Sequence, residues 1–361
     1  MDRSHPRLTR PLLALTLALV SGLLAGCSGS ATIASSWPGL TSDGSTAFIS
    51  YGPAVYAVDL ATGVERWRFP AEVDRTISFY AAPSLTPDGH LIVGGYNHVV
   101  YNLKAEDGTL VWTFAGARDR IIGGATIAGD LALVPSADHT LYALRLSDGR
   151  PAWTFEAQHA LWAAPLVDGE RVYLPALDHR LYALDLVSGN LLWSRDLGVA
   201  MADTPTLTDG LLLVGTFGNG LQALDAQTGE VAWTFATDGW VWGSPVVGQG
   251  VAVFGDVAGV VYGLHPSTGE LLWRIQPDGP VAASPASEGD GVIFGTESGT
   301  VYVRRATSGD PLWEQPLGGK LYSDPLLTGD LVLVGATAGQ VVVTALDPES
   351  GAVRWTYTPA R

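Results

Sequence analysis

The sequence predicts an all-β protein, an eight-bladed β-propeller made of four-stranded antiparallel blades. Its most informative feature is a repeat: a glycine followed four residues later by a tryptophan recurs eight times, at intervals of 40 to 45 residues. Each repeat also holds four short apolar stretches separated by turn residues, and outside the first 26 residues no apolar pattern has a helical period. Four-stranded repeats of about forty residues are typical of propeller blades, which stack face to face around a ring.

The repeat markers place the eight units along the chain. The glycines are Gly63, Gly108, Gly149, Gly189, Gly229, Gly269, Gly309 and Gly351. The tryptophans are Trp67, Trp112, Trp153, Trp193, Trp233, Trp273, Trp313 and Trp355. We therefore assign residues 34–361 to the propeller.

The fourth unit gives the four expected strands in order: residues 161–167, 170–177, 180–186 and 190–196. Gly189 lies in the turn between the third and fourth strands, where a left-handed backbone favours glycine. Trp193 stands on the outermost strand, where its flat ring can pack against the next blade. The adjacent Leu181 and Tyr182 point to opposite faces of the sheet. We expect these repeated residues to hold the fold rather than to carry function.

The first 26 residues are predicted to be a lipoprotein signal peptide, because a basic start (Arg3, Arg7, Arg10) precedes a short apolar run. The stretch Leu24-Ala25-Gly26-Cys27 resembles the lipobox of bacterial lipoproteins, in which the cysteine is lipidated. The alternative is an ordinary signal peptide with a chance cysteine. Residues 27–33 then form a tether. We expect an exported protein, lipid-anchored at a bacterial membrane, and at the outer membrane if the organism has one.

The chain carries 20 Lys+Arg against 36 Asp+Glu, a formal net charge of −16. Nucleic-acid binding through phosphates needs clustered basic residues, so this balance argues against it. Acidity of this kind favours solubility and a monomeric propeller rather than a particular partner.

The pattern "LYALDxxTGxxxW" resembles the PQQ-like repeat, named after quinoprotein alcohol dehydrogenases, and it covers nearly the whole chain after the signal. In those enzymes the resemblance implies a vicinal cysteine pair, a calcium site and a catalytic aspartate. This chain has one cysteine, Cys27, which lies in the lipobox. A second branch is more similar: the BamB family of outer-membrane assembly lipoproteins, with a lipobox, a tether and eight PQQ-like blades. That resemblance implies a non-catalytic scaffold that binds a protein partner through rim loops.

Three histidines, His98, His139 and His179, occupy one place in consecutive units, as a metal cluster would. The later units carry Asn219, Gly259 and Gly299 there. His, Asn and Gly tolerate a positive φ in a tight turn. Equivalent turns of stacked blades lie roughly 10 Å apart, whereas zinc binds its ligands at about 2 Å. We interpret these residues as turn residues.

Catalytic motifs are missing from the sequence, which has no G-x-S-x-G and no H-E-x-x-H. Four aspartates, Asp59, Asp185, Asp225 and Asp347, recur just before the repeat glycine and are interpreted as turn-stabilising. We predict no catalytic residue, no metal site and no cofactor.

Two carboxylates stand apart from the repeat. Asp203 and Asp324 fall in the first strand of their units, which faces the central channel of a propeller, among mostly small residues. They either bind a cation or line a water-filled channel.

Aromatic residues alternate three positions before an aligned proline. Tyr80, Trp162, Trp242 and Tyr322 occupy units two, four, six and eight, and aliphatic residues occupy the units between them. One interpretation is a stacking surface for a ligand or partner at one mouth of the channel. The other is steric, because eight large side chains would not fit around one axis.

Two functions follow. The first is a non-catalytic, membrane-tethered scaffold outside the cytoplasm that presents propeller loops to a protein partner. Its most concrete form is a role in envelope or outer-membrane protein assembly. The second is a PQQ-dependent oxidoreductase or a small-ligand sensor, which only the repeat and the aromatic ring support.

Overall fold

The structure is a computed structural model that describes residues 36–74, 76–218 and 220–360. The predicted signal peptide, the lipidation residue Cys27 and the turn residue Asn219 lie outside the described residues. From Ser36 onward the chain forms one compact unit. In this described part, no helix has the length and apolar character to cross a membrane.

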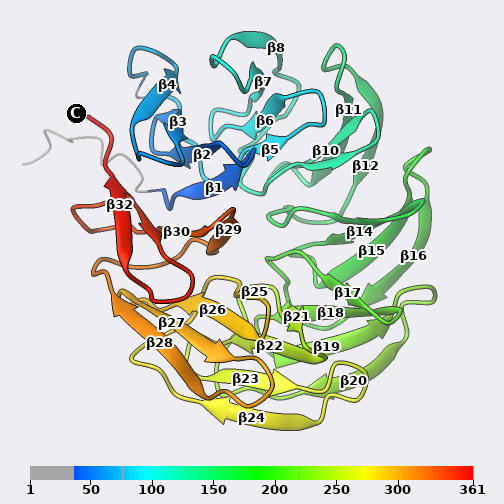
Figure 1. The fold of residues 1–361 in the computed structure, drawn as a ribbon. Coiled ribbons are helices and arrows are strands. Elements are labelled where there is room, and N and C mark those ends of the chain that lie inside the picture. Colours follow the sequence, from blue (N-terminus) through cyan, green and yellow to red (C-terminus); the bar gives the residue numbers. More distant parts are fainter. Residues whose placement is uncertain (1–35, 75, 219, 361) are drawn as a thin grey trace, which may run out of the picture. The chain divides into compact units, whose positions relative to one another are not determined.

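Eight four-stranded antiparallel sheets form a ring (Figure 1), which confirms the predicted eight-bladed propeller. Each sheet is built from four consecutive strands, and the first strand of each lies nearest the centre of the ring. The innermost strands are β1 (Gly39–Ser42), β5 (Ser84–Leu85), β9 (Thr126–Ala128), β13 (Leu166–Asp168), β17 (Thr206–Thr208), β21 (Val246–Gly248), β25 (Ala286–Glu288) and β29 (Leu326–Thr328). The second strands are β2 (Thr46–Tyr51), β6 (His90–Gly94), β10 (Leu131–Pro135), β14 (Arg171–Pro175), β18 (Leu211–Thr216), β22 (Val251–Gly255), β26 (Gly291–Gly295) and β30 (Leu331–Gly335).

The outer half of each blade completes the sheet. The third strands are β3 (Ala54–Asp59), β7 (Val100–Lys104), β11 (Thr140–Arg145), β15 (Arg180–Asp185), β19 (Gly220–Asp225), β23 (Val261–Leu264), β27 (Thr300–Arg305) and β31 (Val343–Leu346). The outermost strands are β4 (Glu65–Phe69), β8 (Leu110–Phe114), β12 (Pro151–Glu156), β16 (Leu191–Asp196), β20 (Val231–Phe235), β24 (Leu271–Ile275), β28 (Pro311–Pro316) and β32 (Val353–Tyr357).

The innermost strands are shorter than predicted. In blade 4 the expected strand over residues 161–167 is wrong, because ladder pairing begins only at Leu166 of β13. Pro165 directly precedes this strand, and a proline has no N–H to give to a ladder. The same holds at Pro205 and Pro325. The residues before these prolines therefore form irregular backbone around the axis instead of a strand.

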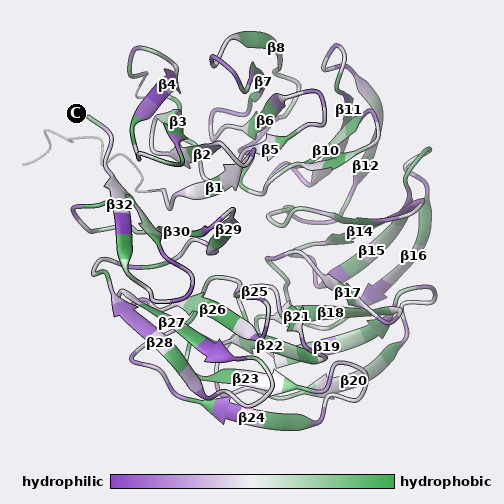
Figure 2. Cartoon of the chain, in the orientation of Figure 1, coloured by the Kyte–Doolittle hydropathy of each residue, from purple (hydrophilic) through white to green (hydrophobic). Residues whose placement is uncertain are grey.

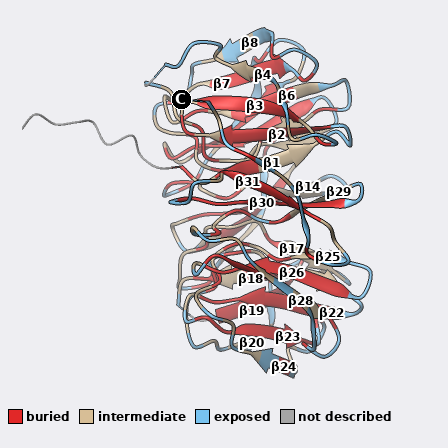
Figure 3. Cartoon of the chain, turned by 60° about the vertical axis from the view of Figure 1, so that its left-hand side comes forward, coloured by how far each residue is buried: buried red, intermediate tan, exposed pale blue. Residues whose placement is uncertain are grey.

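The core lies between neighbouring blades, in the two middle strands of each sheet (Figures 2 and 3). Tyr182 and Leu184 of β15 belong to a buried cluster shared with blade 3. Leu181 and Ala183, on the opposite face, belong to a cluster shared with blade 5. The predicted alternation is confirmed, and each blade is buried on both faces because it has a neighbour on each side.

Tryptophans of the outermost strands join each blade to the next, as predicted. Seven of the eight in the described chain donate Nε1–H to a carbonyl of the following blade at 2.7–3.1 Å. A Cβ added to any repeat glycine would come within 2.5–2.9 Å of the preceding blade's indole. Two separate reasons therefore require glycine at these positions: its φ is positive, and the indole ring of the preceding blade leaves no room for a Cβ.

Trp193 is the exception. Its indole Nε1 is buried and has no hydrogen-bond partner in the described structure. The carbonyl that the repeat would offer it, on Ala226, instead accepts from the Tyr173 hydroxyl at 3.1 Å and from the Arg171 guanidinium at 3.3 Å. Between blades 4 and 5 the Trp193 ring still packs on Gly229, but a tyrosine makes the hydrogen bond that a tryptophan makes at the other contacts.

The ring closes between blades 8 and 1 without an exchanged strand. Trp355 donates to the Leu60 carbonyl at 2.7 Å, and the Tyr357 hydroxyl donates to Glu65 Oε2 at 2.5 Å. Nearer the axis, the Ser323 hydroxyl donates to the Pro38 carbonyl at 2.5 Å. Among the described residues, every hydrogen bond that joins blade 8 to blade 1 is therefore made by a side chain.

The histidine turns are confirmed. His98, His139 and His179 have φ values of 69°, 74° and 72°, and Gly259 and Gly299 take the same left-handed conformation in later blades. The motif aspartates are also turn residues: in each of the four turns one carboxylate oxygen accepts from the Ser or Thr hydroxyl three positions on.

His179→Val is expected to lower the free energy of unfolding by roughly 1–2 kcal/mol, because a β-branched residue is strained at positive φ. His179→Gly should stay within about 0.5 kcal/mol of wild type. Chemical denaturation of the three proteins measures the difference. Equal destabilisation by both changes would mean that the imidazole, rather than the backbone conformation, matters at this turn.

Candidate functional site

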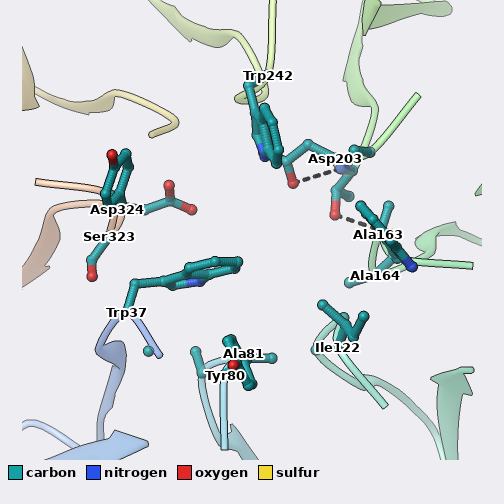
Figure 4. A pocket seen from close by; sticks show the side chains of 18 of the residues that line it. Trp37, Tyr80, Ala81, Ile122, Ala163, Ala164, Asp203, Trp242, Ser323 and Asp324 are labelled. Atoms are coloured by element: carbon teal, nitrogen blue, oxygen red, sulfur yellow. Dashed lines mark hydrogen bonds between the residues drawn. The ribbon is translucent and has the colours of Figure 1, made fainter. Parts of the chain in front are cut away.

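A cavity of about 710 Å³ lies at the axis of the ring, lined by the irregular segments that precede the innermost strands. Small-molecule sites typically measure about 300–1,000 Å³. Many of the residues that line it are small, including Ala81, Ala163 and Ala164 (Figure 4). Small residues suit these segments because eight of them converge on one axis: a Cβ on Gly123 would meet the Trp162 carbonyl at 2.4 Å.

All four aromatic residues singled out in the sequence line this one cavity: Tyr80, Trp162, Trp242 and Tyr322. The structure therefore brings them together. Tyr80 is buried, Trp162 and Tyr322 are half-buried, and Trp242 is exposed.

The alternation of aromatic and aliphatic residues does not extend to blade 1, because Trp37 lines the same cavity. It sits directly beside Tyr80 of blade 2, with ring centroids 5.2 Å apart in an edge-on arrangement. Figure 4 shows its indole extending toward the middle of the cavity. The sequence alignment missed it because blade 1 has Leu40 where most other blades have the marker proline. The steric explanation required aromatics to be kept apart, and this pair of neighbours weakens it.

An aromatic and cationic group continues from Trp37 along one side of the cavity. Tyr80 packs against Tyr96 with centroids 4.9 Å apart, and the Arg120 guanidinium lies over the Tyr96 ring at 4.9 Å. Arg120 also donates to the Tyr96 hydroxyl at 2.6 Å and pairs with Asp119 at 3.2 Å. The charge of Arg120 is thus already engaged by its neighbours.

An exposed aromatic cluster, defined as Phe217, Trp240 and Trp242, lies where blades 5 and 6 meet the cavity. Phe217 stacks on Trp240 at 5.7 Å and packs against Trp242 at 5.0 Å. Trp240 is 53% exposed and Trp242 is 38% exposed. Sequence reasoning found only Trp242, because the positions of Phe217 and Trp240 carry no aromatic residue in the units on either side.

The two carboxylates predicted on the innermost strands lie just before them instead. Asp203 and Asp324 both line the cavity, but β17 begins at Thr206 and β29 at Leu326. Both side chains thus come from irregular backbone rather than from a strand. Asp203 is half-buried and Asp324 is exposed to the cavity.

A ladder of serines connects the two carboxylates across blades 5 to 8. Asp203 Oδ2 accepts from the Ser244 N–H at 2.8 Å and from the Ser284 hydroxyl at 2.9 Å. Asp324 Oδ1 accepts from the Ser284 N–H at 2.7 Å. Asp203 Oδ1 also accepts from the Thr204 N–H at 2.7 Å. Asp203 therefore accepts three hydrogen bonds. Asp324 accepts one and keeps an oxygen facing the cavity (Figure 4).

The enclosing ring limits the hydration of both carboxyl groups and raises the pKa of each. For Asp324, which is exposed only to the cavity, this limited hydration is the first cause and the charge of Asp203 is the second; together they raise the pKa to about 7. For Asp203 burial also raises the pKa, and its hydrogen bonds to Thr204, Ser284 and Ser244 oppose that rise.

Asp324→Asn is expected to change how stability depends on pH. Because the folded chain holds the Asp324 proton up to about pH 7 and an unfolded aspartate loses it near ~3.9, the folded state binds more protons between these values. Stability therefore falls as pH rises through that window. Melting temperatures at pH 4 to 7 should fall less in Asp324→Asn than in wild type.

Glu349→Gln serves as the matched control, because it removes one exposed carboxylate from the turn that follows β31. Its melting curve should run parallel to that of wild type. If the Asp324→Asn curve also runs parallel, the carboxyl titrates normally and the argument for its raised pKa is wrong.

The cavity residues do not fit pyrroloquinoline quinone, the cofactor that the repeat's name suggests. The quinone is a tricarboxylate, so Asp203 and Asp324 would face it with like charge. Arg120 is the one basic side chain among the described cavity residues. Ca²⁺ takes about six to eight oxygen ligands. Within residues 36–74, 76–218 and 220–360, no three His, Cys, Asp or Glu side chains gather as a metal site.

A closed ring of eight four-stranded blades, joined by repeat tryptophans around an aromatic cavity, defines a β-propeller of PQQ-like repeats. Comparison with family models identifies the family to which this propeller belongs. The model described as outer membrane protein assembly factor BamB matches residues 29–120, 96–203, 188–276 and 257–360. These matches span almost the whole propeller, and the chain belongs to that family.

Solved structures share the fold at low identity. BamB from Moraxella catarrhalis has a TM-score of 0.71 and 20% identity, covering 85% of this chain and 92% of its own. The computationally designed Ika8 protein has a TM-score of 0.71 and 15% identity, covering 87% and 96%. A europium-containing methanol dehydrogenase has a TM-score of 0.70 and 14% identity, covering 84% and 82%. A search of curated proteins finds no match.

Proposed function

We propose that this protein is a non-catalytic binding scaffold, exported and held at a bacterial membrane by lipid on Cys27, that serves outer-membrane protein assembly. The observation that carries the proposal is the match of the BamB family model along residues 29–360. The lipobox Leu24-Ala25-Gly26-Cys27 supports the anchor and the location outside the cytoplasm.

The exposed aromatic cluster supports a protein partner. Tryptophan and other aromatic residues are enriched at protein interfaces, where they act as buried anchors. Trp240 and Trp242 lie half exposed on one face of the ring, beside a cavity that adds Tyr80, Trp162 and Tyr322 as further contacts. We assign the partner-binding surface to this mouth of the channel.

The oxidoreductase alternative has weaker support. A methanol dehydrogenase shares the fold, but at 14% identity the likeness concerns the fold alone. The chain has a single cysteine, so it lacks the cysteine pair that the resemblance to quinoprotein dehydrogenases implies. The carboxylates of the cavity also oppose an anionic quinone.

The proposal is tested by crosslinking the tagged, lipidated protein in native membranes and identifying the captured proteins by mass spectrometry. Enrichment of an outer-membrane barrel assembly protein, lost when Cys27→Ser prevents lipidation, would support the proposal. Enrichment of unrelated wall enzymes or transporters alone would contradict it. Dye reduction with alcohols after adding pyrroloquinoline quinone and Ca²⁺ would instead establish the oxidoreductase.

A further inference from the structure

The cavity combines two features that recur in sites for organic cations. Six aromatic residues line it: Trp37, Tyr80, Tyr96, Trp162, Trp242 and Tyr322. Two carboxylates, Asp203 and Asp324, line it as well. Aromatic faces attract ammonium and guanidinium groups, and the attraction grows where water is partly excluded.

We propose that the axial cavity binds an organic cation, a primary ammonium or guanidinium group on a flexible stem, between the Asp324 carboxylate and the indole rings of Trp37 and Trp242. The inference concerns the cavity alone and goes beyond the scaffold role. It stands whether or not an assembly partner is found.

The charges around the cavity favour a cation over an anion. Arg120, the one basic residue among the described cavity residues, pairs with Asp119 and with the Tyr96 hydroxyl. Lys320, next to Tyr322, pairs with Glu297 at 3.3 Å. Each of these two basic residues thus forms an ion pair with an acidic residue. The carboxylates of Asp203 and Asp324 have no such partner and leave the cavity with a net negative charge when they are ionised.

The two carboxylates have different tasks in this site. Asp203 receives the Ser244 N–H, the Ser284 hydroxyl and the Thr204 N–H, so it is committed to the serine ladder. Asp324 receives the Ser284 N–H at 2.7 Å through one oxygen, and its exposed side chain can reach a ligand through the other. Asp324 is therefore the carboxylate that contacts the cation, and Asp203 positions the ladder that supports it.

The volume suits a stem that carries the charge. A cavity of about 710 Å³ is larger than one ammonium group needs and admits an extended aliphatic chain across the aromatic faces. Such a cation has two possible sources: a free polyamine, or a lysine or arginine side chain of a bound polypeptide. Both present the same chemistry, and the experiment distinguishes them.

Isothermal titration of the purified full chain at pH 8 and low salt tests the inference, with spermidine as one probe and a short capped lysine peptide as the other. Triethylene glycol, which is neutral, is the control ligand. We expect one site per chain, and binding that is at least tenfold weaker in Asp324→Asn. Trp37→Leu should weaken it at least threefold, and Glu349→Gln should change it less than twofold.

Asp324→Asn keeps an amide oxygen that can accept the Ser284 N–H, and its melting temperature shows whether it folds. Binding should also weaken from pH 8 to pH 6, because the pKa of Asp324 is raised to about 7 and its carboxyl gains a proton in that range. Asp203, the other carboxyl on the serine ladder, also has a raised pKa, so its protonation would weaken binding in the same direction. The pKa values of Arg120 and Lys320 are raised, so both stay charged.

Each outcome decides the question. Site-specific binding of spermidine assigns a free polyamine, and binding of the peptide alone assigns a basic side chain. Binding by neither probe, or several weak sites insensitive to Asp324→Asn, would overturn the inference. Recovery of an assembly protein by crosslinking together with no cation binding would leave the scaffold role standing and remove this inference alone.

Discussion

Trp355→Ala is expected to lower the free energy of unfolding by about 3 kcal/mol, the low end of the range for a large aromatic residue replaced by alanine. Trp355 packs on Gly63 of blade 1, where an added Cβ would approach its ring to 2.9 Å, and it donates to the Leu60 carbonyl at 2.7 Å. The chain does not cross this contact, so the contact must be held by side chains. Denaturant unfolding of the purified chain measures the change.

Two further variants separate the causes. Trp153→Ala removes the same repeat residue at a contact that the chain itself bridges, and we expect it to be less destabilising than Trp355→Ala. Trp355→Phe keeps an aromatic ring but loses the hydrogen bond to Leu60, which is worth about 1 kcal/mol. If Trp153→Ala and Trp355→Ala have equal effects, ring closure is no more sensitive than any other contact between blades.

Trp240→Ala is expected to weaken binding of the assembly partner by about 30-fold, since aromatic anchors at the centre of an interface contribute about 2 kcal/mol or more. Trp240 is 53% exposed and stacks on Phe217, so its removal takes away contact surface while leaving the core intact. Titration of the captured partner against wild type and variant measures the affinity.

Val187→Ala is the control for this experiment, because Val187 is 76% exposed at the turn that follows β15, on the outer part of blade 4. It should bind the partner as wild type does. Unchanged affinity in Trp240→Ala, with normal folding, would place the partner elsewhere on the propeller and remove the exposed aromatic cluster from the proposal.

The fold could be predicted from the sequence because its cause is local and repeated. Every unit carries its own turn glycine and its own tryptophan, and each tryptophan reaches the glycine of the next unit, so one pattern encodes both the blade and its neighbour. The exception at Trp193 also has a local cause, since the Tyr173 hydroxyl donates to the Ala226 carbonyl that the indole would otherwise have bound.

The site could be predicted only in part. The repeat aligned Tyr80, Trp162, Trp242 and Tyr322, and the ring brings them into one cavity. Trp37 was missed because blade 1 lacks the marker proline, and Phe217 and Trp240 were missed because they meet only through folding. The serine ladder joins residues 40 and 81 positions apart, and no spacing rule distinguishes such serines from those of a turn.

Each blade uses four consecutive strands, and this has a consequence for how the chain can be ordered. The contact between blades 8 and 1 uses the same tryptophan, glycine and carbonyl as the contacts that the chain crosses. The propeller could therefore begin and end between any two neighbouring blades and keep the same contacts. A gene rearranged to begin at blade 5, with the two ends of the propeller joined by a short linker, is therefore expected to encode a ring in which every blade keeps its neighbours.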